Sequence, residues 1–233
     1  MATKCFFIDQ TNGANILALP SIAINPKPAS WLGASTVVSM DAGKAYFIST
    51  FSDTWAVSDF IDYRNRNIVG VAVLKDSLAD IDQNAAGGSY LIALEIVPGA
   101  IFDTYNVLLL DLKSDKVILS VGGEKYTYPL FVTTDGLNVY VCYLASYPTK
   151  PYRVVNHYIM NNGTFEFVQT GKTVKNALLD ACHAGNGRWY AIDSKNVHLY
   201  ADWDLQTVIK TWYHGLISAG GVFYNYNHVG VLY

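Results

Sequence analysis

Charged side chains, cysteines and long apolar runs are all scarce in this sequence of 233 residues. Charged residues make up 15% of the chain, compared with about 25% in typical globular domains. Lysine and arginine number 16 and aspartate and glutamate 19, which gives a formal net charge of −3, and neither sign forms a block. Such dispersed cations cannot release many counterions from a duplex, so we expect no nucleic-acid partner.

Uninterrupted apolar runs are short, as in Ile68–Leu74, whereas a membrane-spanning helix needs about 20 apolar residues. At the N-terminus, Lys4 is followed by four apolar residues before Asp9. The apolar core of a secretory signal is roughly 7–15 residues long. We therefore expect no membrane span, and synthesis in a cytoplasm without a signal peptide.

The three cysteines, Cys5, Cys142 and Cys182, are odd in number and form no C-x-x-C motif. This excludes a disulfide framework and a zinc ribbon, and predicts buried thiols in a reducing compartment. Cys182 next to His183 is the alternative, a catalytic pair, but neighbouring residues of a strand point to opposite faces. His183 and His228 fall at matching turns of neighbouring units, where a metal would need a third ligand such as Asp41 or Asp135. Their spacing is a weak signal, so we expect neither metal nor cofactor.

Strand and turn signals fill most of the chain. Hydrophobic residues make up 51% of it, with 17 tyrosines and 10 phenylalanines. Apolar runs of roughly four to eight residues alternate with turn sequences such as Asp135-Gly136. The best helical candidate, Leu78–Ala86, is short. The composition excludes a disordered chain, and the pattern predicts an all-β fold.

One pattern recurs: an apolar run that ends in a polar residue, a turn, and a second apolar run. It returns at intervals of roughly 40–50 residues, the length of a four-stranded propeller blade. We predict a single five-bladed β-propeller over residues 1–233, with a β-sandwich as the alternative. Its fifth blade is shared by both termini, with Cys5–Asp9 antiparallel to Val229–Tyr233, so that no sheet edge is left open. The predicted blades span residues 35–76, 77–123, 127–170, 174–213, and 218–233 together with 4–20.

This architecture resembles that of tachylectin-type lectins in size and blade number, and it is similar to that of five-bladed, arabinanase-like glycosidases. The resemblance covers the whole chain at the level of strand pattern, without a lectin repeat motif. A glycosidase needs paired carboxylates that flank one bond, but the predicted inner strands offer acids only at Asp80 and Asp82. A soluble lectin and a glycoside hydrolase-like enzyme are the alternative functions that the resemblance implies.

In a propeller, the links between blades and the connections between the second and third strands of each blade lie on one face. The longest loops fall there: Ser49–Ser58, Ile96–Asn106 and Ala145–Arg153, and the link before the third blade adds Tyr128. Turns on the other face, such as Asp202–Asp204, are predicted to be solvated. Rings on long loops suit sugar stacking or a protein interface, whereas the alternative is that they fill the spaces between blades. The candidate partner-binding residues are Trp31, Trp55, Tyr105, Tyr147, Tyr152 and Tyr213.

The sequence contains neither G-x-S-x-G nor H-E-x-x-H, and no other converging catalytic set. We therefore expect a non-catalytic interaction or scaffold module, not an enzyme, that binds a protein or glycan through its aromatic face and takes part in a multimeric assembly. Low charge, abundant tyrosine and the absence of a signal peptide are similar to features of virion components. The specific hypothesis is a structural or attachment protein of a phage or archaeal virus.

Overall fold

The computed structural model describes residues 3–8, 15–22, 29–33, 36–41, 44–49, 56–63, 66–74, 90–99, 103–111, 117–122, 127–135, 138–145, 151–161 and 164–213. Within these ranges the protein is all-β, and every strand pair is antiparallel. The same ranges contain no helix that is long and apolar enough to cross a membrane. In chain order the strands are β1 (Thr3–Ile8), β2 (Asn15–Ile22), β3 (Ala29–Gly33), β4 (Thr36–Asp41), β5 (Lys44–Ser49), β6 (Ala56–Asp62), β7 (Ile68–Leu74), β8 (Tyr90–Val97), β9 (Thr104–Asp111), β10 (Val117–Gly122), β11 (Thr127–Thr134), β12 (Asn138–Ala145), β13 (Tyr152–Asn161), β14 (Thr164–Thr170), β15 (Asp180–Gly185), β16 (Arg188–Ile192), β17 (Asn196–Tyr200) and β18 (Val208–Tyr213).

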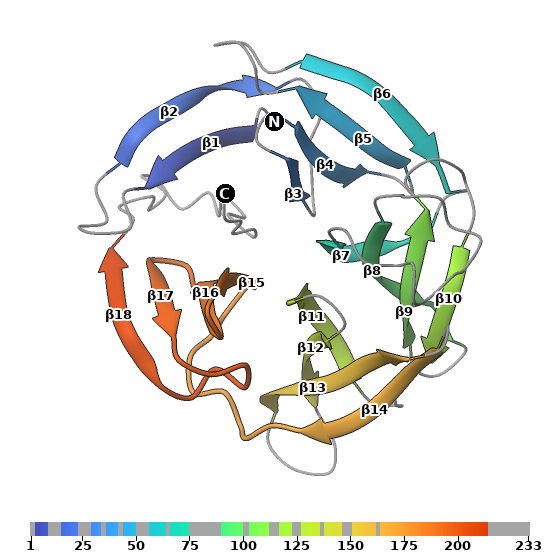
Figure 1. Ribbon diagram of the computed structural model, residues 1–233, viewed down its shortest axis with the longest axis vertical. Helices are drawn as coiled ribbons and strands as arrows, with labels where there is room; N and C mark the ends of the chain where they lie inside the picture. The colour runs from blue at the N-terminus through green and yellow to red at the C-terminus, as the bar shows by residue number, and fades with distance from the viewer. Residues whose placement is uncertain are drawn as a thin grey trace.

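The sheets follow one another around a ring (Figure 1). Four of them have four strands, in the orders β3-β4-β5-β6, β7-β8-β9-β10, β11-β12-β13-β14 and β15-β16-β17-β18, and β1 pairs with β2 in a further sheet. In each four-stranded sheet the first strand lies nearest the centre of the ring and the last at the rim. Inner strands touch across the sheets, β3 with β7, β7 with β11 and β11 with β15. This arrangement is radial and propeller-like, and it is not the two stacked layers of a sandwich.

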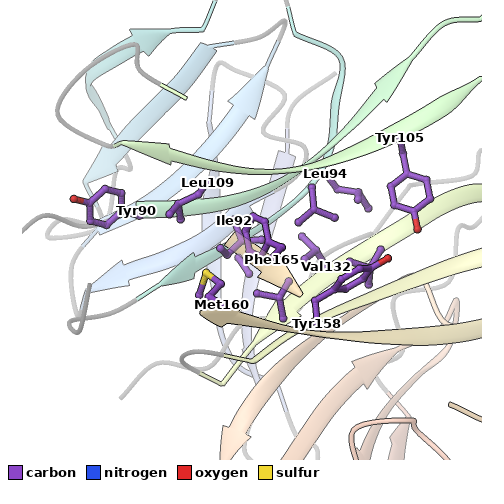
Figure 2. Close-up of a cluster of buried hydrophobic side chains, with 13 residues drawn as sticks. Tyr90, Ile92, Leu94, Tyr105, Leu109, Val132, Tyr158, Met160 and Phe165 are labelled. Carbon is purple, nitrogen blue, oxygen red and sulfur yellow. The ribbon is translucent and has the colours of Figure 1, made fainter. Parts of the chain in front are cut away.

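The largest described core lies between the second and third four-stranded sheets (Figure 2). Ile92 and Leu94 of β8 and Val132 of β11 are fully or almost fully buried in it. A strand inside the ring has a neighbouring sheet on each of its faces. This explains why β8 is apolar apart from Glu95 and is buried along almost its whole length, without the alternation of a half-exposed strand.

Glycine permits the close approach of two inner strands. A Cβ atom at Gly70 of β7 would lie 3.3 Å from the backbone nitrogen of Val132 and 3.4 Å from the Cα of Phe131, both in β11. The space at this contact is therefore matched to a residue without a side chain. Glycine at position 70 therefore allows the inner strand β7 to pack directly against the backbone of β11.

The structure groups the first strands differently from the predicted blades 35–76 and 77–123. Ala29–Gly33 is the inner strand of the first four-stranded sheet, and Ile68–Leu74 is the inner strand of the second. The predicted boundaries of these two blades are therefore wrong by one strand. The reason is that Ala29–Gly33 is short and follows two prolines, so its sequence resembles that of a linker. The sheets β11–β14 and β15–β18 lie within the predicted ranges 127–170 and 174–213.

The predicted closing pair falls partly outside the described residues, because these end at Tyr213. The described part is β1, which includes Cys5, paired with β2 through contacts such as Phe6 with Ala18. The pairing of Cys5–Asp9 with Val229–Tyr233 therefore stays a prediction. The helical candidate Leu78–Ala86 lies outside the described residues as well.

Candidate functional site

The connections of the four-stranded sheets fall at two ends of the ring. Each sheet begins at its inner strand, and successive strands reverse direction. The links to the next sheet and the connections between second and third strands therefore share one end, which we call the linker end and which includes Val97 and Ala145. The opposite end, which includes Thr134 and Gly185, is the turn end.

Three exposed tyrosines lie at the linker end of the third and fourth four-stranded sheets. Tyr128 is 52% exposed, Tyr152 37% and Tyr213 58%. Tyr128 lies near the start of β11, and Tyr152 is the first residue of β13. Tyr213 is the last residue of β18 and pairs with the first residue of β17. We call these three residues the tyrosine surface.

The six predicted aromatic residues separate in the structure. Tyr152 and Tyr213 are exposed, whereas Tyr105 is fully buried and stacks on Tyr143 with ring centroids 6.5 Å apart. Tyr105 is therefore a packing residue and does not belong to an exposed face; it pairs with Ile96 inside the strand ladder instead of lying in the loop. Trp31 lies in β3, where the side chains are not described.

Two further members, Trp55 and Tyr147, lie outside the described residues. The expectation that these two residues lie at the linker end therefore stays a prediction.

Apolar side chains are also exposed on two rim strands. Phe167 and Val168 of β14 and Val208 and Ile209 of β18 are all exposed. Successive residues of a strand point to opposite faces, so both faces of these strands are accessible at these positions. On β18 the exposed apolar residues and Tyr213 lie along one strand.

A second aromatic group fills the seam between the third and fourth four-stranded sheets. The ring of Tyr140 stacks on His157 at 4.9 Å and on Trp203 at 5.6 Å, and it meets Trp189 edge-on at 5.6 Å. The turn 202–204 is therefore not simply solvated as predicted. Gly171 leaves room for Trp203, because a Cβ there would lie 3.2 Å from the indole ring.

Burial sets the acid–base properties of this seam. It raises the pKa of Tyr140 well above the usual range. Asp135, which accepts a hydrogen bond from the Tyr140 hydroxyl at 3.0 Å, raises that pKa further. Burial lowers the pKa of His157 and of His183, although the charge of Asp135 opposes both changes. The phenol and both imidazoles are thus neutral near pH 7, as a packed structural contact requires.

Asp193, His198 and Thr211 form a hydrogen-bonded chain across the fourth four-stranded sheet. His198 Nε2 lies 3.0 Å from Asp193 Oδ2, and His198 Nδ1 lies 2.9 Å from Thr211 Oγ1. The other carboxylate oxygen of Asp193 accepts the backbone N–H groups of Lys195 and Asn196, both at 2.7 Å. Burial acts to raise the pKa of Asp193, but these hydrogen bonds outweigh it and lower the pKa to about 2. The carboxylate is therefore ionised at neutral pH.

The thiols of Cys142 and Cys182 are poor nucleophiles. Burial raises the pKa of Cys182 well above its usual value, and Asp180 raises it further. Burial also raises the pKa of Cys142 to about 12, although Arg153 opposes this. Both thiols stay protonated at neutral pH, which argues against the catalytic pair of Cys182 and His183.

The sequence candidates for acid catalysis, Asp80 and Asp82, lie outside the described residues. In the ranges that the structure covers, no group of three or more histidine, cysteine, aspartate or glutamate side chains could hold a metal ion. A separate ion pair joins Arg66 to the buried Glu95 at 2.9 Å, and Asn106 donates to the same carboxylate at 3.1 Å. This cluster ties β8 and β9 to the link that precedes β7 at the linker end.

Sequence reasoning missed the chain of Asp193, His198 and Thr211. Asp193 and Asn196 are recognisable as turn residues. The contact of His198 with Thr211, however, depends on the exact register of β17 against β18. Hydrophobic periodicity does not fix register to a single residue in a rim strand that is exposed on both faces.

No protein-family model matches the sequence, and no curated protein matches it. Solved structures similar to this chain include the following two. A functionally unknown protein from Desulfotomaculum acetoxidans DSM 771 has 9% identity and a TM-score of 0.47, over 92% of this chain and 78% of that one. YCF48, in a structure bound to D1 peptide, has 8% identity and a TM-score of 0.35, over 84% of this chain and 73% of that one.

Proposed function

We propose that the protein is an interaction module, not a turnover enzyme, and that it binds a protein partner through the tyrosine surface. The observation that carries this proposal is the exposure of Tyr128, Tyr152 and Tyr213 at one end of two neighbouring sheets. A tyrosine has few rotatable bonds, so its ring loses little conformational entropy on binding, and it offers both an apolar body and a polar tip.

A protein suits this surface better than a glycan does. Sugar sites combine a stacking ring with several hydrogen-bonding groups, whereas the residues that accompany Tyr213 along β18 include the exposed aliphatic side chains of Val208 and Ile209. Aromatic and aliphatic side chains together are typical of the centre of a protein interface. A glycan ligand is therefore the alternative that the experiment below must distinguish.

The scaffold of this surface is, in our proposal, a closed five-bladed propeller. β2 lies at the rim and β1 inside it (Figure 1), which is the placement of the third and fourth strands of a blade. Two strands from the C-terminal segment would complete that sheet on the inner side of β1. Closure would leave no inner edge exposed.

The low charge and the tyrosine-rich composition support a virion component as the specific setting. Such a component would bind its neighbours in the particle through the tyrosine surface. Purified particles from the source should then contain the chain in a fixed stoichiometry to the major coat protein. Its absence from washed particles would exclude this setting but not the binding role.

The binding role is tested by retention of proteins from an extract of the source cells on the immobilised chain, with a glycan array run in parallel. The variant is Tyr128→Ala/Tyr213→Ala, and the matched control is Phe167→Ala, which removes an equally exposed ring from the rim. Truncation of a central anchor costs about 2 kcal/mol, or about 30-fold in Kd. We expect specific proteins to be retained by the wild type and the control and lost from the double variant. Equal retention by all three chains, or glycan binding without protein binding, would contradict the proposal.

A further inference from the structure

We propose that Thr211 is a nucleophilic hydroxyl, activated by His198 and Asp193, that accepts an acyl group from an activated ester. This function is distinct from partner binding by the tyrosine surface, although Tyr213 takes part in both, and a single acylation event is enough for it. It would attach the interaction module covalently to an ester-bearing molecule.

The first argument is the geometry of the hydrogen bonds. Asp193 is ionised at neutral pH, and its Oδ2 lies 3.0 Å from His198 Nε2. In the tautomer that carries its hydrogen on Nε2, Asp193 accepts that hydrogen, and Nδ1 accepts the hydroxyl hydrogen of Thr211 across 2.9 Å. This is the order of groups in a hydroxyl–imidazole–carboxylate triad, with the two ring nitrogens exchanged.

The second argument is accessibility. His198 is buried, and its side chain is only 8% exposed, whereas Thr211 is on the surface of the rim strand. The base is therefore shielded while the nucleophile remains open to a reagent. Tyr213 lies two positions beyond Thr211 in the regular part of β18, on the same face, and it is exposed. Its ring provides an apolar platform for the acyl or aryl part of an ester.

The third argument concerns the charge that develops on the carbonyl oxygen. β18 is the last strand of its sheet, and in the part of the chain that the structure describes no other strand pairs with it. Backbone N–H groups alternate between the two sides of a strand. Either Thr211 or its neighbour Trp212 therefore presents an N–H group on the open side of the strand, near the hydroxyl, where it could stabilise an oxyanion.

The reaction step is an acyl transfer without any change of oxidation state. Thr211 Oγ1 forms a bond to the carbonyl carbon, and the hydroxyl proton moves to His198 Nδ1, which gives an imidazolium that Asp193 stabilises. The tetrahedral intermediate breaks the bond to the leaving oxygen, which takes the proton from Nδ1. The products are an ester at Thr211 and a free alcohol or phenol.

The competing account is that the chain of hydrogen bonds only fastens β18 to the turn at Asp193. The two accounts differ in reactivity. The test is incubation of the full chain with p-nitrophenyl acetate, followed by peptide mapping of acetylated threonines by mass spectrometry. Thr173 and Thr207 are exposed, and they serve as references within the same molecule.

A general base accelerates such a step by about 10²–10⁴-fold. We therefore expect Thr211 in the wild type to acetylate about 100-fold faster than Thr173 and Thr207. His198→Gln should remove this advantage, Thr211→Val should remove the adduct, and the matched control His157→Gln should retain both. Equal rates at the three threonines of the wild type would overturn the proposal, and that comparison needs no variant to fold. A folded His198→Gln protein that reacts at the wild-type rate would overturn it as well.

Discussion

Replacing Leu94 with alanine should test whether the second and third four-stranded sheets share one core. Leu94 is fully buried in the cluster between them (Figure 2). Leucine-to-alanine changes in cores cost about 2–5 kcal/mol, and the cost depends on how far the site can collapse. Here collapse is limited by backbone, because a Cβ placed at Gly70 would lie only 3.4 Å from the Cβ of Leu94 and 3.3 Å from the backbone of β11.

We therefore expect a loss of about 3.5–5 kcal/mol, in the upper half of this range. For a chain of this length that lowers Tm by roughly 7–20 °C. Leu94→Met, which conserves volume, should cost less than about 1.5 kcal/mol. Urea unfolding with a common m-value for all variants provides the measurement.

A double-mutant cycle with Val132→Ala makes the test specific for the contact between sheets. Leu94 and Val132 belong to different sheets but to one buried cluster. Residues in contact show coupling of about 0.5–3 kcal/mol, whereas distant sites add to within about 0.5 kcal/mol. Leu178, buried in the seam beside the fourth sheet, is the distant control. Strict additivity of Leu94→Ala with Val132→Ala, or a cost below about 1 kcal/mol for Leu94→Ala, would refute the packing described here.

Three further predictions follow from the structure. The pKa of Asp193 is about 2 in the folded chain, below its usual value of 3.8, so its contribution of about 1–2 kcal/mol to stability after solvent screening is present above pH 3.8 and lost as pH falls towards 2. Asp193→Asn should flatten the stability profile measured by chemical unfolding in that window, and an unchanged profile would contradict this. Gly171→Ala should cost about 1–3 kcal/mol in the same assay, because its Cβ would lie 2.5 Å from that of Asp204; an unaffected stability would show that the loop does not pack there. Finally, fluorescence titration at physiological salt should detect no micromolar binding to duplex DNA, since the net charge is −3, whereas a salt-sensitive micromolar affinity would be the contrary result.

The sequence predicted the fold class because strands buried on both faces, such as Tyr90–Val97, are almost entirely apolar and are bounded by turn residues. It did not place Ala29–Gly33 correctly, since a five-residue inner strand after two prolines has the local features of a linker. Strand order depends on which edges meet in space, and the local pattern does not contain that information.

The candidate site was predicted only in part, for a similar reason. Tyr105 and Tyr152 both flank loops at the linker end, yet Tyr105 is buried and Tyr152 is exposed. Aromatic residues at strand ends are equally suited to a core and to a surface, so composition alone cannot separate the two. Trp203 shows the opposite case. Its position between Asp202 and Asp204 predicted a solvated turn, but its indole ring packs on Tyr140.

Closure of the ring is the claim on which the proposed scaffold rests, and hydrogen exchange of β1 tests it most directly. β1 pairs with β2 on one side, so only alternate amides of an open β1 would be protected. If strands from the C-terminal segment complete the sheet, nearly all the amides of residues 3–8 should exchange slowly. The rim strand β18 provides the internal reference for an open edge, with about half of its amides exchanging fast. Slow exchange along the whole of β1 beside a half-protected β18 is the predicted result, and a half-protected β1 would contradict the five-bladed ring.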